Sequence, residues 1–205
     1  MNSILFRELT LYLKLFFLLT PFFVLSMFIS LTAGINHALK AKLAWRITLG
    51  CIGVTLAIFL CGTYIMKVFD ITVDAFRMGS GVLLLLTAIN QVVGKQDVTG
   101  PVRADLLLDM AIVPLAVPIT AGPATLGTLM VMGTTATDAI EKLLTALAIV
   151  FSCGSVGLML YLSNRLVDWL GHSNISILSK LSGLILCAIA MQMIVVGAKN
   201  LWLAP

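Results

Sequence analysis

The stretch that decides the fold is Ile112–Val131, IVPLAVPITAGPATLGTLMV. It is apolar and long enough to cross a bilayer, which takes about 20 predominantly apolar residues. It also contains Pro114, Pro118 and the dipeptide Gly122-Pro123, and a proline inside a helix removes a backbone donor and clashes with the preceding turn. These residues predict two half-helices that meet at a break near the membrane midplane. Lipid cannot bond the backbone groups freed there, so the break must face protein or a polar cavity, where we expect a site.

The composition places the whole chain in a membrane. Of its 205 residues, 60% are hydrophobic and only 11% are charged, and the mean hydropathy is +1.09. Such values exclude an ordinary soluble domain. The apolar runs are continuous rather than alternating, which favours helices over a membrane β-barrel. The net charge of +4 is scattered between the runs, so no nucleic-acid-binding patch is expected.

The apolar runs predict an all-α polytopic protein with six transmembrane helices in one membrane domain. The spans are expected at about Leu9–Leu31, Ala44–Met66, Phe76–Val93, Met110–Gly133, Ile140–Asn164 and Ile177–Gly197. Between them we expect a polar loop at Ile35–Lys42, an interfacial link at Lys67–Arg77, and a polar connection at Arg165–Ser176. Within the interfacial link, Asp74 and Arg77 are spaced to pair on one helical turn.

A common spacing of 102 residues suggests an internal repeat. It separates Pro21 from Pro123, Gly81 from Gly183, and Asn90 from Gln192. The repeats would cover about residues 1–95 and 110–205, with a linker at about 96–109. Because each copy has three spans, the copies must cross the membrane in opposite directions. This is the inverted-repeat plan of many secondary transporters, in which interrupted spans at matching positions indicate the binding site. Spans one and four are thus both expected to break near the midplane.

The chemistry available at the two breaks is neutral and polar. No Asp, Glu, Lys, Arg or His lies at the centre of a span, which argues against a proton relay and a strongly charged substrate. The N-terminus of each second half-helix would attract an anion, and the freed carbonyls would attract a cation. A small zwitterion suits such a site. The candidate binding residues are Thr20, Pro21, Thr120, Ala121, Gly122, Pro123 and Thr125 at the breaks, with Asn90 and Gln192 toward the ends of spans three and six.

Structural alternatives remain open for these polar side chains. Each threonine could instead bond to a carbonyl of its own helix. The amide side chains could lie at the membrane surface, because amides are costly in hydrocarbon. Three glycines are expected to serve only close helix packing, namely Gly79, Gly81 and Gly183.

Catalysis, metals and cofactors find no support in the sequence. A serine or cysteine nucleophile needs a base within reach, and neither His37 nor His172 lies at membrane depth. The four cysteines form no CxxC motif and lie in apolar runs, so they read as buried small hydrophobes rather than metal ligands. No phosphate-binding loop is present, so direct coupling to ATP is not expected.

Three segments resemble the MarC family of bacterial inner-membrane proteins. They are DAFRMGSGVLLLLTAI (Asp74–Ile89), VPLAVPITAGPATLGTL (Val113–Leu129) and KLSGLILCAIAMQMIVVGAK (Lys180–Lys199). The resemblance implies a six-span protein similar to the small neutral amino-acid transporters of the SnatA type, within the LysE-like exporter group. It would move alanine, glycine or serine outward across the inner membrane.

The sequence departs from the family pattern at two positions. The first break usually reads Asn-Pro and is Thr20-Pro21 here, while the last span usually begins with arginine and here begins at Lys180. Two other functions stay open, a channel-like facilitator for a small polar solute and a non-transporting membrane partner subunit. A homo-oligomer is compatible with either. Basic residues divide seven to six between the two sides, which slightly favours both termini outside the cytoplasm.

Overall fold

The computed structural model describes residues 2–93, 121–136 and 138–203, and every regular element in these ranges is an α-helix. The helices are α1 (Asn2–Leu18), α2 (Pro21–Leu31), α3 (His37–Val68), α4 (Val73–Val93), α6 (Pro123–Thr135), α7 (Ala139–Tyr161) and α8 (Ser163–Leu203). Five described stretches are long and apolar enough to span a bilayer: Phe6–Leu31, His37–Val68, Val73–Val93, Ala139–Tyr161 and Ser173–Leu203. The expected linker and the first half of the expected fourth span lie outside the described residues.

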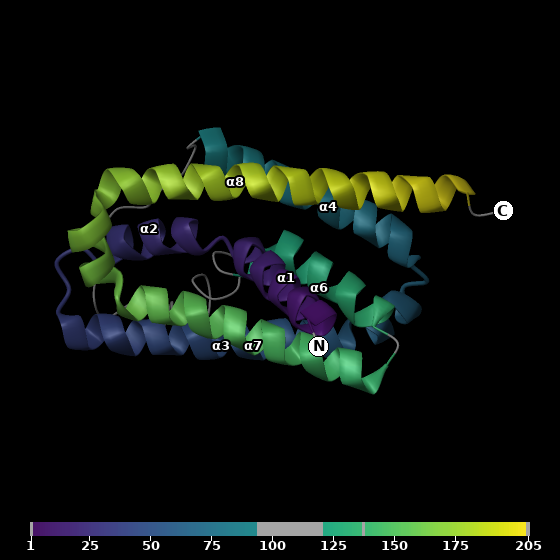
Figure 1. Cartoon of the computed structure of the whole chain (residues 1–205), viewed down its shortest axis with the longest axis horizontal. Coiled ribbons are helices and arrows are strands. Elements are labelled where there is room, and N and C mark those ends of the chain that lie inside the picture. Colours follow the sequence, from purple (N-terminus) through teal and green to yellow (C-terminus); the bar gives the residue numbers. More distant parts are fainter. Residues whose placement is uncertain (1, 94–120, 137, 204–205) are drawn as a thin grey trace.

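The helices are arranged in three layers (Figure 1). Long helix α4 packs along α8 in one outer layer, and α3 packs along α7 in the other. The short helices α1, α2 and α6 lie between them, with α2 against α8, α6 against both α3 and α4, and α1 against α7. The interrupted elements are thus in the middle of the bundle, where protein rather than lipid surrounds their freed backbone groups.

Two segments predicted as polar connections are helical. The expected loop at Ile35–Lys42 gives way to α3 at His37, because the Asn36 side chain caps that helix by accepting a hydrogen bond from the Leu39 amide at 2.8 Å. Residues 165–176 belong to α8, which kinks at Gly171, where φ is +76°. Both predictions were wrong for the same reason. A polar segment is expected to lie outside the hydrocarbon of the bilayer, but a helix can continue beyond the hydrocarbon, so polarity alone does not predict where a helix ends.

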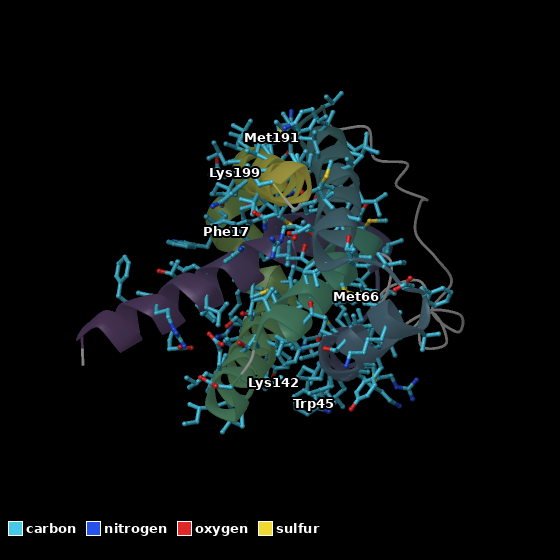
Figure 2. The ribbon with its side chains drawn as sticks, turned by 90° about the vertical axis from the view of Figure 1, so that its right-hand side faces the viewer. Phe17, Trp45, Met66, Lys142, Met191 and Lys199 are labelled. Atoms are coloured by element: carbon cyan, nitrogen blue, oxygen red, sulfur yellow. The ribbon has the colours of Figure 1, made fainter. Side chains whose placement is uncertain are left out.

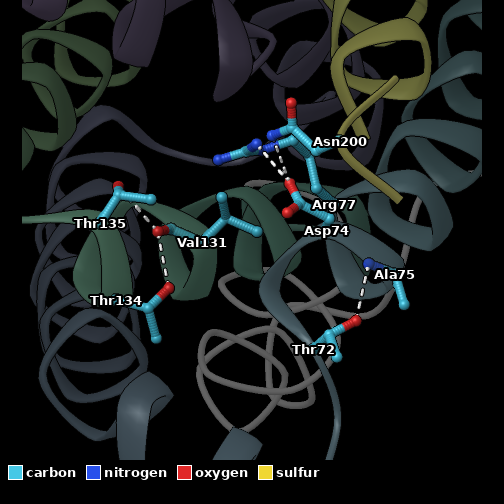
Figure 3. Close-up of polar contacts among 8 residues, drawn as sticks. All are labelled: Thr72, Asp74, Ala75, Arg77, Val131, Thr134, Thr135 and Asn200. Carbon is cyan, nitrogen blue, oxygen red and sulfur yellow. Dashed lines mark hydrogen bonds and ion pairs between the residues drawn. The ribbon is translucent and has the colours of Figure 1, made fainter. Parts of the chain in front are cut away.

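The predicted pairing of Asp74 with Arg77 is confirmed. Arg77 donates to Asp74 Oδ1 at 2.7 Å, and Asn200 near the end of α8 donates to the same oxygen at 3.0 Å (Figure 3). The Thr72 hydroxyl accepts a hydrogen bond from the Ala75 amide at 3.3 Å in the same turn. The acidic residue also complements the positive end of the α4 dipole, so this cluster joins the start of α4 to the end of α8.

Glycines allow α4 and α8 to approach closely. A Cβ on Gly81 would lie 2.8 Å from Ile194 Cγ1 and 3.1 Å from the Ala190 carbonyl oxygen. A Cβ on Gly183 would lie 2.8 Å from Val92 Cγ2 and 3.2 Å from the Ala88 carbonyl oxygen. Gly79 does not follow the packing expectation: it is exposed, and no described atom lies within 4 Å of its Cβ position. Only the helix face that carries Gly81 meets α8.

We predict opposite effects for two alanine substitutions on α4. Gly81→Ala should lower the stability by about 1–3 kcal/mol, because the added methyl group overpacks against Ala190 and Ile194. Gly79→Ala should be neutral or stabilising by up to about 1 kcal/mol, because alanine is the better helix former and meets open space. Thermal unfolding in detergent measures both changes, and equal losses for the two variants would contradict the packing assignment.

Candidate functional site

The first break lies between α1 and α2. Helix α1 ends at Leu18, and α2 begins with Pro21 as its first residue. Between them, Thr20 adopts a left-handed conformation with φ 48° and ψ 54°, and it is buried. The Thr20 amide bonds back to the Phe17 carbonyl at 2.9 Å, and its carbonyl accepts the first bond of α2 from Val24 at 3.0 Å. Because Thr20 leaves the right-handed helical conformation and Pro21 has no N–H group, the hydrogen-bond ladder of α1 does not continue from Leu18 into α2.

The predicted second break falls at the start of α6, and the residues that precede Ala121 lie outside the described residues. Gly122 is extended, with φ −63° and ψ 166°, and Pro123 is the first residue of the helix. Ala121 before it is fully buried, and the Leu126 amide bonds to the Gly122 carbonyl at 3.0 Å. Neither N-cap residue, Thr20 of α2 or Gly122 of α6, makes a side-chain capping hydrogen bond. Each half-helix therefore presents the amides of its first turn, and the positive end of its dipole, to the interior.

A hydrogen bond joins the two breaks. The Thr125 hydroxyl, in the first turn of α6, donates to the Leu18 carbonyl at the end of α1 at 3.0 Å, and both residues are buried. Thr128, one turn further along α6, bonds instead to the Ala124 carbonyl of its own helix at 2.9 Å. Thr125 thus supplies a donor to a carbonyl that the first break has left without its helical partner.

A small cavity adjoins this hydrogen bond. Its volume is about 10 Å³, and it is lined by Leu15, Leu19, Thr55, Thr125, Leu129, Ile149, Ser152 and Cys153 of α1, α3, α6 and α7. Like Thr125, the other two lining hydroxyls bond to backbone: Thr55 donates to the Cys51 carbonyl at 2.6 Å and Ser152 to the Tyr12 carbonyl at 3.3 Å. A space of this size accommodates about one water molecule.

Two thiols meet beside the cavity. Cys51 Sγ of α3 and Cys153 Sγ of α7 are 3.5 Å apart, and Thr55 Oγ1 lies 3.7 Å from Cys153 Sγ. Both thiols are free and buried. Sequence reasoning treated them as separate hydrophobes and missed Thr55 and Ser152 altogether. The available signal was the spacing between the two cysteines, which is again 102 residues.

The structure gathers only part of the predicted site. Thr20 and Pro21 flank the first break, and Ala121, Gly122, Pro123 and Thr125 form the second, whereas Thr120 lies outside the described residues. Asn90 on α4 and Gln192 on α8 are exposed and do not join this cluster. The buried amide is instead that of Gln91, which donates to the Ser179 carbonyl at 2.9 Å and ties α4 to α8. Within the described residues, no group of three or more His, Cys, Asp or Glu could hold a metal.

Comparison with known proteins assigns the family. Residues 6–202 match the MarC family integral membrane proteins. The chain belongs to the MarC family. It is similar to the UPF0056 membrane protein MJ1677 of Methanocaldococcus jannaschii, with 36% identity over 91% of this chain and 93% of the relative. Similar relatives include the UPF0056 membrane proteins PH0760 of Pyrococcus horikoshii, at 30% identity over 93% of each chain, and YhcE of Escherichia coli, at 28% identity over 93% of this chain and 91% of the relative. No solved structure matches the chain.

The backbone conformation of Thr20 can be compared with the residue that is usual at this position in the MarC family. The resemblance noted above places asparagine at this position in the family. Asparagine enters the left-handed region far more readily than a β-branched residue, for which a positive φ is an outlier. Thr20 is one of only two non-glycine residues with positive φ in the described chain, the other being Asp70. The threonine is therefore held in a strained backbone conformation by its surroundings.

We predict that Thr20→Asn stabilises the protein by about 1 kcal/mol, because asparagine lowers the cost of the left-handed conformation. Thr20→Val, which keeps the branched side chain, should bring no such gain. Thermal unfolding of both variants in detergent measures the difference. A loss of stability in Thr20→Asn equal to that in Thr20→Val would contradict backbone strain at this position.

We also predict that Thr125→Val destabilises the protein by about 1–3 kcal/mol, because it leaves the buried Leu18 carbonyl without a donor. Thr128→Val is the matched control on the same helix, since the Ala124 carbonyl that it bonds keeps its helical partner. The control should cost less than half as much in the same thermal unfolding measurement. Equal losses of stability in the two variants would show that the Thr125–Leu18 bond stabilises the protein no more than an ordinary threonine bond within a helix does.

Proposed function

We propose that this protein is a secondary transporter that exports small neutral amino acids, of the alanine, glycine and serine class, across the bacterial inner membrane. The observation that carries the proposal is the Thr125–Leu18 hydrogen bond, which brings two helix breaks together inside a membrane protein. Discontinuous helices that meet near the midplane are a common way to build a transporter binding site.

The polarity of the breaks favours a zwitterion as the substrate. The uncapped N-termini of α2 and α6 suit a carboxylate, and the carbonyls at the end of α1 suit an ammonium group. Thr20, Pro21, Ala121, Gly122, Pro123 and Thr125 would form the binding surface. The cavity lining carries hydroxyls and aliphatic groups but no charged side chain, which favours a small neutral side chain on the substrate.

The size of the cavity indicates a closed state. A space of about 10 Å³ is too small even for glycine, which is several times larger than water. Binding would therefore require α1 and α6 to separate, which would break the Thr125–Leu18 bond. Its donor and acceptor would then be available to the substrate, so the ligand would replace an interaction that the closed protein makes with itself. Such opening to alternate sides is the movement that transport requires.

We propose further that residues 1–95 and 110–205 are inverted repeats joined by a linker at 96–109. Contacts between the halves are reciprocal: Gly81 lies against Ala190 and Ile194, and Gly183 against Ala88 and Val92, and the members of each equivalent pair are 102 positions apart. A two-fold relation produces such exchange of contacts. It also predicts that a residue on the axis touches its own equivalent, as Cys51 touches Cys153.

Counterflow in proteoliposomes tests the proposed function. Vesicles containing purified protein and unlabelled alanine should transiently accumulate labelled alanine from outside, and preloading with serine or glycine should drive the same accumulation. Gly122→Leu should abolish it, because the added side chain would occupy the break. Gly53→Leu is the matched control, since Gly53 is exposed and no described atom lies within 4 Å of its Cβ position.

Each alternative has its own outcome in this assay. Non-saturating flux without counterflow would indicate a channel-like facilitator. An absence of flux from protein that is folded and inserted would contradict transport of these solutes and favour a partner subunit. Unaltered counterflow in Gly122→Leu would support a carrier but place its site elsewhere.

A further inference from the structure

The outer face of the α3–α7 pair carries an apolar groove that shares no lining residue with the cavity beside the helix breaks. The groove has a volume of about 480 Å³, and its lining includes Trp45, Leu49, Ile52, Gly154, Leu158 and Tyr161. Trp45 lies at the outer edge of the molecule, on the α3 side of the bundle (Figure 2). Gly154 forms part of the floor, and no described atom lies within 4 Å of its Cβ position. The groove is therefore open to an apolar occupant from the bilayer.

A polar pocket continues the groove toward the membrane surface. This second pocket, of about 240 Å³, is lined by His37, Tyr161, Leu162, Asn164 and Arg165. Tyr161 lines both spaces, and the His37 ring packs edge-on against it with ring centroids 6.1 Å apart. The apolar groove thus adjoins, at Tyr161, a pocket with cationic and polar groups. A molecule that occupies both must have an apolar tail and a polar, preferably anionic, head.

The charges at this end of the bundle are predominantly positive. Lys40, Lys42 and Arg46 lie in the first turns of α3, and Arg165 lies at the start of α8. Within the two segments 36–46 and 161–170, the only acidic side chain is Asp168. Lys40 donates to Asn164 Oδ1 at 3.0 Å, which joins the two sides of the pocket. The potential at the mouth of the groove therefore favours an anion.

The length of the groove matches one leaflet of a bilayer. Its lining on α3 extends from Ala41 to Ile52, which at the helical rise amounts to about 16 Å. Half of the hydrocarbon thickness of a bilayer is about 15 Å. Trp45 and Tyr161 lie toward the end of the groove near the polar pocket, where amphipathic aromatic residues are enriched at membrane interfaces.

We propose that the groove and the adjoining pocket bind an anionic phospholipid. One acyl chain lies between α3 and α7 over Gly154, and the phosphate group lies beside His37 and Arg165. A second copy of this chain would fill the apolar groove but would leave the basic pocket without a counter-charge. Basic pockets between transmembrane helices are recognised sites for acidic lipid head groups. The site is separate from the helix breaks, so it holds whether or not the protein transports amino acids.

Native mass spectrometry on the delipidated full-length protein tests the proposal, with dioleoylphosphatidylglycerol and dioleoylphosphatidylcholine as probes. The wild type should bind one phosphatidylglycerol at least about fivefold more tightly than phosphatidylcholine, as expected for one favourable basic contact. Gly154→Leu should abolish binding of both lipids by filling the groove. The control Gly53→Leu, an exposed glycine on the same α3–α7 layer, should bind as the wild type does.

Arg165→Gln keeps the test valid if Gly154→Leu does not fold, because Arg165 is exposed and its side chain makes no hydrogen bond or ion pair with the residues that the structure describes. It should lose the preference for phosphatidylglycerol and still bind phosphatidylcholine. Equal affinity of the wild type for both lipids would overturn the proposal. So would unchanged lipid binding in Gly154→Leu, or conversion of a dimer to a monomer by that variant with the bound lipid unaltered.

Discussion

A backbone carbonyl in the middle of a membrane must find a donor within the protein, and the Leu18 carbonyl is the clearest case in this chain. The left-handed turn at Thr20 ends the helical path, so the Leu18 carbonyl does not receive the donor that a continuous helix would supply, and no water is available from lipid. Thr125, from a segment more than 100 residues later, supplies the donor. This one requirement explains why the first turn of α6 meets the end of α1 in the interior. It also explains why the uncapped ends of α2 and α6 are tolerable: they are enclosed by protein.

The two outer layers make this interior possible. Helix α4 and the part of α8 after the kink at Gly171 pack along each other through Gly81 and Gly183, and α3 and α7 meet at the Cys51–Cys153 contact. Within a regular helix the backbone groups bond to one another, so the long helical stretches of these layers can face lipid. The stability of the bundle is therefore concentrated in elements that need not move. The middle layer, which contains α1, α2 and α6, contacts the outer layers through small side chains.

Sequence reasoning found the breaks because proline has an unambiguous physical effect, and both half-helices begin at the expected residues, Pro21 and Pro123. It was less successful with side chains on regular helices. Asn90 was chosen and is exposed, whereas Gln91 is buried, since one residue along a helix rotates a side chain by about 100°. The same geometry separates exposed Gly79 from packed Gly81. Composition fixes which segments cross the membrane, but only tertiary contacts decide which face points inward.

The two breaks differ in a way that bears on movement. Thr20 is left-handed, while Gly122 is extended. Helix α6 also packs closely on α3, where a Cβ on Gly62 would lie 2.8 Å from Met130 Cα, whereas α2 touches α7 far less. Under the proposed inverted repeat, α2 with α7 and α6 with α3 are equivalent pairs, so the two halves hold different conformations. In a transporter with such repeats, an exchange of conformations between the halves converts one open side into the other. If the proposed transport cycle holds, strain at Thr20 belongs to its closed state, and it would be relieved when the first break takes the geometry that Gly122 has here.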